Sequence, residues 1–168
     1  VALMQLVNWA VKGFSFDLAT LIRMLPMLGA VLYFARKSKW ILIVPALSMV
    51  AFWAHPIGRS VWYYALYWLI PIAMHFLRDR FLYARALGAT FTAHGIGGAL
   101  WIWTFNMKAA VWISLIPIVA KERLLMALGI TLTYIAFNYI LSKILERLHL
   151  HLPFITLHPK YSSSGDKT

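Results

Sequence analysis

A glycine-rich segment around His94 has the residue types best suited to binding a small molecule. If this segment is helical, Thr90, His94 and Gly98 share one stripe, and Trp101 follows further along. An inward imidazole and hydroxyl, an indole that can stack, and the space left by Gly97 and Gly98 would form the wall of a ligand site. The alternative is a tightly packed helix in which His94 is hydrogen-bonded to a neighbour. Both interpretations remain open at this point.

The same segment supports a second function. Ala89, Ala93 and Gly97 recur every four residues and would form a smooth groove that another helix can approach closely. This groove predicts a non-catalytic accessory subunit that packs against other membrane subunits. Glu122 and Arg123 are further candidates for contact with such a partner. Capping is the competing explanation for Glu122, because a carboxylate in the first turn of a helix is stabilised by the helix dipole.

Two more polar residues fall inside apolar stretches. Arg23 lies about two turns into the first stretch, where burial costs about 2.5 kcal/mol or more unless the side chain snorkels or pairs. It either reaches toward the end that contains Asp17, or it points inward and binds a carboxylate or phosphate of a solute. Asn138 lies in the last stretch, where it either makes an interhelical hydrogen bond or contacts the solute.

The sequence offers little chemistry for an enzyme. It has no cysteine, no His-Glu-x-x-His motif and no paired carboxylates within an apolar stretch. His55, His75 and His94 fall at unequal depths, so we expect no haem or metal site, and the sequence names no cofactor. An intramembrane enzyme that uses His94 as a general base is a third interpretation, for which the sequence supplies no carboxylate partner.

The composition defines the elements that must position these residues. Because 62% of the chain is hydrophobic and only 12% is charged, we predict an all-α polytopic integral membrane helical bundle in a cell membrane. Clusters of charge divide the chain into apolar stretches at about 16–35, 40–54, 61–77, 86–105, 109–120 and 124–145. The fifth stretch has only about twelve residues and contains Pro117, so it is either a crossing or re-entrant. We therefore expect five or six transmembrane helices.

The third stretch opens with a run of aromatic residues, Trp62, Tyr63, Tyr64, Tyr67 and Trp68. Tryptophan and tyrosine favour the headgroup level of a bilayer, because one end of each ring is apolar and the other is polar. Several of these rings could instead line an internal cavity. The sequence does not separate the two roles.

Basic residues are distributed unequally between the turns. Those after the first, third and fifth stretches carry eight Lys and Arg residues, whereas those after the second and fourth carry only Arg59 and Lys108. We expect the eight to face the cytoplasm. The net charge of +11 is then explained by lipid phosphates, and we expect no nucleic acid partner. We expect a transmembrane bundle over 1–147, with 1–12 interfacial or truncated, and an amphipathic and disordered tail over 148–168.

The short fifth stretch, the glycine-rich fourth stretch with His94, and Glu122-Arg123 before the last stretch resemble the S-components, or substrate-binding subunits, of energy-coupling-factor vitamin transporters. The resemblance covers most of residues 16–145 and rests on architecture. It implies capture of a small solute near the outer face and docking on a separate membrane subunit through small residues of the first helix. In this chain the first stretch offers only Gly29 and Ala30 for that role. The leading prediction is binding and transport of a small aromatic or anionic solute, with the lipid bilayer and other membrane subunits as partners.

Overall fold

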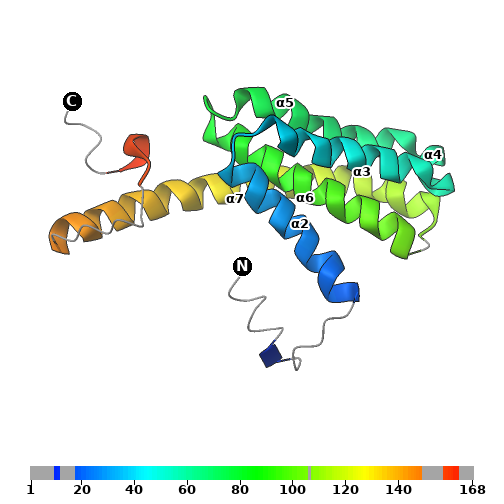
Figure 1. The fold of residues 1–168 in the computed structure, drawn as a ribbon, viewed down its shortest axis with the longest axis horizontal. Coiled ribbons are helices and arrows are strands. Elements are labelled where there is room, and N and C mark those ends of the chain that lie inside the picture. Colours follow the sequence, from blue (N-terminus) through cyan, green and yellow to red (C-terminus); the bar gives the residue numbers. More distant parts are fainter. Residues whose placement is uncertain (1–9, 12–17, 106, 149–156, 163–168) are drawn as a thin grey trace.

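The computed structural model describes residues 10–11, 18–105, 107–148 and 157–162, with the backbone alone for 18–23. Every element within these ranges is helical, which confirms the all-α class (Figure 1). The expected segment 1–12 and Asp17 fall almost entirely outside the described residues.

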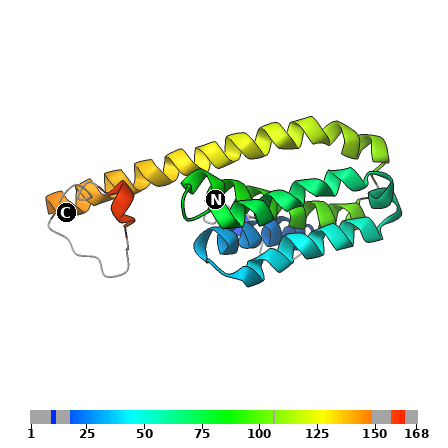
Figure 2. The ribbon, with the colours of Figure 1, turned by 90° about the horizontal axis from the view of Figure 1, so that it is seen from above.

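The bundle is built around one central helix, α6. Four other helices pack against it (Figures 1 and 2). The five are α2 (Leu18–Ala35), α3 (Ile43–Ala54), α5 (Leu69–Leu77), α6 (Leu82–Thr104) and α7 (Ala109–Leu148). Small residues dominate the buried part of α6, among them Gly88, Ala89, Gly95 and Gly98. At these small residues, neighbouring helices can approach the backbone of α6 closely.

Short helices connect the longer ones. They are η1 (Lys39–Leu42), α4 (Pro56–Ser60), η2 (Trp62–Trp68) and, near the C-terminus, η3 (Pro159–Tyr161). The break between α3 and α4 falls at His55, whose backbone is extended because the proline that follows disfavours the helical region. The ring of His55 then caps α4, since its Nδ1 accepts a hydrogen bond from the Ile57 amide at 3.2 Å.

The stretches expected at 109–120 and 124–145 form one continuous helix, α7, of 40 residues. A re-entrant 109–120 segment is therefore not observed. The charged residues 121–123 are good helix formers and include no glycine or proline, so nothing local ends the helix there. At 1.5 Å per residue α7 is about 60 Å long. Its first half packs along the bundle, and its second half extends beyond it (Figure 2).

Among the described helices, α7 is the only one that is long and apolar enough, by length and composition, to cross a membrane. The helix α6 has 23 residues, but its glycines, threonines and His94 make it less apolar. Shorter apolar helical segments occur at Met24–Ala35 and Lys39–Ala54.

The groove that we expected a partner to fill is occupied by α2 of the same chain. A Cβ added at Gly88 would overlap the ring of Tyr33, and one at Gly29 would overlap Ile96 on α6. Gly97 faces Pro26, whose Cγ lies 3.8 Å from the position of an added Cβ. Tyr33 is fully buried and its Oη donates to the Pro71 carbonyl at 2.7 Å, which ties α2 to α5.

Charged residues gather at the two ends of the bundle. At one end, the guanidinium groups of Arg78 and Arg85 both donate to the carbonyl of Phe34, at 3.1 and 2.5 Å, and Lys37 pairs with Asp79. The opposite end carries Arg59, in α4, and Lys108, just before α7. The basic turns after the first and third stretches therefore lie together at one end of the bundle, which we call the basic end. The third basic group, Lys121 and Arg123, lies in no turn, because α7 continues through it.

The ion pair at the basic end predicts a loss of stability in acid. The hydrogen bond from Lys37, aided by the charges of nearby arginines, lowers the pKa of Asp79. A carboxyl group whose pKa is lower in the folded state stabilises the fold above its ordinary pKa of about 3.9, and this contribution is lost as the pH falls through the folded value. We therefore expect the temperature of the thermal unfolding midpoint in detergent to decrease as the pH is lowered through this acid range. Asp79→Asn should remove that part of the pH dependence; an unchanged profile in the variant would contradict the assignment.

Candidate functional site

His94 lies in an aromatic cluster inside the bundle. Its Nε2 is 3.1 Å from Oη of Tyr64. The rings of Tyr64, Tyr67, Trp68 and Phe91 surround it, with centroids 5.7, 6.5, 6.3 and 6.4 Å from its own. This contact agrees with the interpretation of a packed helix in which His94 is hydrogen-bonded to a neighbour. We call these five residues the His94 cluster.

The short helix η2 supplies most of the cluster. Its tight turn directs Tyr64 and Trp68 inward, where both are buried, while Trp62 and Tyr63 remain exposed. The aromatic run is therefore divided: some rings face outward, and others are packed in the core. Tyr67 also reaches α7, since its Oη donates to the Ile116 carbonyl at 2.8 Å.

Glycines of α6 make room for an indole of the chain itself. The ring of Trp68 lies over Gly95 and Gly98, and a Cβ added at Gly98 would be 2.7 Å from Trp68 Cζ2. Such a contact is too close for two carbon atoms, so Gly98 is required for this packing. The space that we expected Gly98 to leave for a ligand is filled by Trp68.

Three buried N–H donors near the cluster have no hydrogen-bond acceptor among the described residues. They are Trp68 Nε1, Trp112 Nε1 and Arg123 Nε. The Trp112 ring is 5.0 Å from that of Tyr64, and the charge of Arg123 interacts with both Tyr64 and His94. A buried donor left unpaired costs about 1–3 kcal/mol. A molecule that brought acceptor oxygens to these donors would recover part of that energy.

The element that presents Arg123 is α7. Trp112, Val119 and Arg123 are spaced so that they share the face of α7 that packs on the bundle, and the first two are buried. Arg123 is only partly exposed and forms an ion pair with Glu122, with NH2 and Oε2 3.5 Å apart. Glu122 itself is exposed, which is consistent with either of the roles expected for it.

The other predicted site residues do not converge on His94. Thr90 is buried, but its Oγ1 donates to the Leu87 carbonyl of its own helix at 2.9 Å. Trp101 is 46% exposed and packs against Phe105. Asn138 lies on the second half of α7, where its Oδ1 accepts from the His158 amide at 3.1 Å. The side chain of Arg23 lies outside the described residues.

The predicted partner-contact residues Ala89 and Ala93 lie on α6, and Ala89 is buried. Helical spacing puts both on the side of α6 where Ile96 and Gly97 meet α2. This placement explains why they are small. Because α2 occupies this side of α6, the predicted contact with a second protein would have to use other surfaces.

Sequence reasoning did not identify Trp68 and Trp112 as site residues. The only signal for Trp68 was its place in the aromatic run, and the sequence did not indicate which rings of that run are buried. Among the residues that the structure describes, no three His, Asp or Glu side chains are grouped as metal ligands would be. Comparison with models of protein families, with curated proteins and with solved structures found no match.

Proposed function

We propose that this chain is a multi-pass membrane protein that binds and transports a small solute carrying both an aromatic ring and a carboxylate or similar acceptor group. The His94 cluster, with Trp112 and Arg123, is the proposed binding site. The observation that supports this most directly is the set of three buried, unpaired donors beside an aromatic cluster.

Membrane insertion is supported by the outer surface of the bundle. Large apolar side chains are exposed on α2, α3 and the first half of α7, among them Val31, Leu47, Val50 and Ile113. Exposure of so many large apolar side chains is typical of contact with lipid or with another protein. Basic residues are concentrated at one end, as expected for the cytoplasmic side of a membrane protein.

The class of solute follows from the chemistry of the site. Aromatic rings around His94 favour a flat ligand, because ring pairs stack or meet edge to face. Donors without acceptors favour a ligand rich in oxygen, and the permanent charge of Arg123 favours an anion. In this proposal Arg123 takes the role that we expected of Arg23. Trp68, which now fills the space over Gly98, would have to move when the solute enters.

Topology can be tested by cysteine labelling, because the chain has no natural cysteine. Lys39→Cys at the basic end and Ser60→Cys at the other end replace exposed residues. Gly58 is unsuitable, since a Cβ there would overlap the Phe52 carbonyl. With a membrane-impermeant reagent on intact cells, only Ser60→Cys should be labelled. Equal labelling of both variants from outside would contradict the topology.

Native mass spectrometry of the detergent-purified protein tests the solute site. We expect a co-purifying small molecule whose mass fits an aromatic acid, and we expect its occupancy to drop about tenfold or more in Trp112→Phe, which removes one donor but keeps a ring. Trp40→Phe is the matched control, because Trp40 is 79% exposed and lies outside the cluster. A bare mass after purification from cells, or equal loss in both variants, would argue against the site.

A second function, that of an accessory subunit, is favoured by the part of α7 that extends beyond the bundle. Its exposed side chains include Leu132, Phe137 and Ile140. An apolar surface of this type could pack against another membrane subunit. The third interpretation, an intramembrane enzyme, gains no support from the described residues, because the contacts of His94 are with aromatic side chains.

A further inference from the structure

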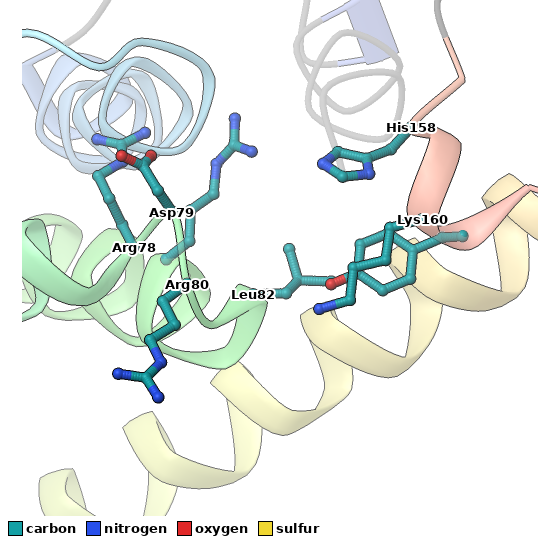
Figure 3. Close-up of a pocket in the computed structure, with 8 residues that line it drawn as sticks. Arg78, Asp79, Arg80, Leu82, His158 and Lys160 are labelled. Atoms are coloured by element: carbon teal, nitrogen blue, oxygen red, sulfur yellow. The ribbon is translucent and has the colours of Figure 1, made fainter. Parts of the chain in front are cut away.

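A cavity of about 220 Å³ opens at the basic end, between the α5–α6 turn and the C-terminal segment (Figure 3). It lies apart from the His94 cluster and belongs to no site described above. Basic side chains dominate its lining, which consists of Arg78, Asp79, Arg80, Leu82, Arg85, His158, Lys160 and Tyr161. Four of these residues carry a permanent positive charge, and one carries a negative charge.

The C-terminal segment closes this pocket on one side. The amide of His158 donates to Asn138 Oδ1, and the ring of Tyr161 packs edge to face on Tyr134, so the segment is held on α7. In Figure 3, His158 and Lys160 face the turn that carries Asp79 across the opening. This part of the expected tail 148–168 is thus ordered; the rest of that tail lies outside the described residues.

The charges of the pocket are not balanced within the described chain. Asp79, its only carboxylate, is already paired with Lys37. Arg78 and Arg85 donate to the same Phe34 carbonyl, which brings two like charges together. Arg78 is only 3% exposed, yet its NH1 has no hydrogen-bond partner in the part of the chain that the structure describes. An anion with several acceptor oxygens would relieve both the repulsion and the unpaired donor.

The arginines are also held in place before any ligand arrives. The guanidinium of Arg78 stacks over the Tyr33 ring at 5.1 Å, and that of Arg85 stacks over Phe34 at 4.6 Å. Burial, and next the charge of Arg85, lower the pKa of Arg78. A preformed group of guanidinium donors suits a tetrahedral oxyanion, because less side-chain entropy is lost on binding.

We propose that this basic pocket binds a phosphate group. The phosphate could belong to the headgroup of an anionic phospholipid or to a soluble phosphate compound, since both present the same oxygens. A lipid source rests additionally on the membrane insertion proposed above, whereas phosphate recognition itself does not.

Calorimetric titration of the full chain in a neutral detergent distinguishes these sources. The probes are inorganic pyrophosphate and, in mixed micelles, phosphatidic acid, with diacylglycerol as the lipid that lacks phosphate. Binding of phosphatidic acid without binding of pyrophosphate identifies a lipid headgroup site. Binding of pyrophosphate identifies a site for soluble phosphates. Both results support the proposal, and binding of neither probe overturns it.

Variants then locate the site. Arg80→Gln/Lys160→Gln removes two charges from side chains that hold no other element in place, and should weaken binding of the phosphate probe about tenfold or more. Arg59→Gln/Lys108→Gln removes two charges from the opposite end and should change the affinity by no more than about twofold. Equal weakening in both double variants, or no change in the first, would show that the pocket is not the binding site.

Discussion

Replacing Trp68 with alanine should lower the free energy of unfolding by about 3–5 kcal/mol, the largest effect that we expect of any single substitution. Trp68 is fully buried, meets Phe52 edge to face at 5.2 Å, and covers Gly95 and Gly98. Truncation would leave a cavity between α3, η2 and α6 that these helices cannot close without moving. Reversible unfolding in mixed detergent micelles, followed by tryptophan fluorescence, measures the change.

Two further variants make this result interpretable. Trp101→Ala removes the same side chain from an exposed position, and should lower the free energy of unfolding by less than about 1 kcal/mol. Trp68→Phe keeps most of the packing and removes the unpaired Nε1 donor, so it should cost much less than alanine. A Trp101→Ala variant as unstable as Trp68→Ala would contradict the assignment of Trp68 to the core and of Trp101 to the surface.

Gly88→Ala should lower the free energy of unfolding by about 1–3 kcal/mol, although alanine is the better helix former. The added methyl group would overlap the ring of Tyr33. That ring has no room to retreat, because it is fully buried, its Oη is bonded to the Pro71 carbonyl, and Arg78 lies over its face. Thermal and chemical unfolding in detergent should both report the loss.

Gly97→Ala is the control for this prediction. It lies on the same helix and also faces α2, but an added Cβ would meet only Pro26 Cγ, at 3.8 Å. This is ordinary contact, so the variant should be as stable as the parent or slightly more stable. A Tyr33→Leu background provides a second check, because Gly88→Ala should be less destabilising when the aromatic ring is absent. Equal losses at Gly88 and Gly97 would rule out the close approach of α2.

Several features of this protein could be predicted from local sequence. The apolar composition and the length of the apolar stretches indicated an all-helical chain, which the structure confirms for its described part. The grouping of basic residues was predictable because each turn returns the chain to one of two ends. The hydrogen bond of His94 was one of the two interpretations that the sequence left open, since a buried imidazole in an apolar helix needs a partner. Membrane insertion and solute binding remain predictions.

Other features depended on contacts between residues far apart in the chain. Helical spacing shows which residues share a face, but not which neighbour covers that face. The groove at Ala89 and Ala93 could accept any helix, and the structure assigns it to α2. Trp101 was expected to stack on a ligand, and Trp68 was only one ring of an aromatic run, yet Trp101 is exposed and Trp68 is buried over Gly98.

The continuity of α7 and the basic pocket likewise depend on tertiary contacts that local sequence does not determine. No local signal ends the helix at residues 121–123, so whether it continues depends on the packing of its first half against α6 and on the absence of a breaker. The pocket joins Arg78 and Arg85 to Lys160, which are separated by most of α6 and all of α7. Composition and periodicity determined the elements and the charge of their ends, whereas only the tertiary structure decided which side chains meet, because those contacts arise from shape and burial between distant segments.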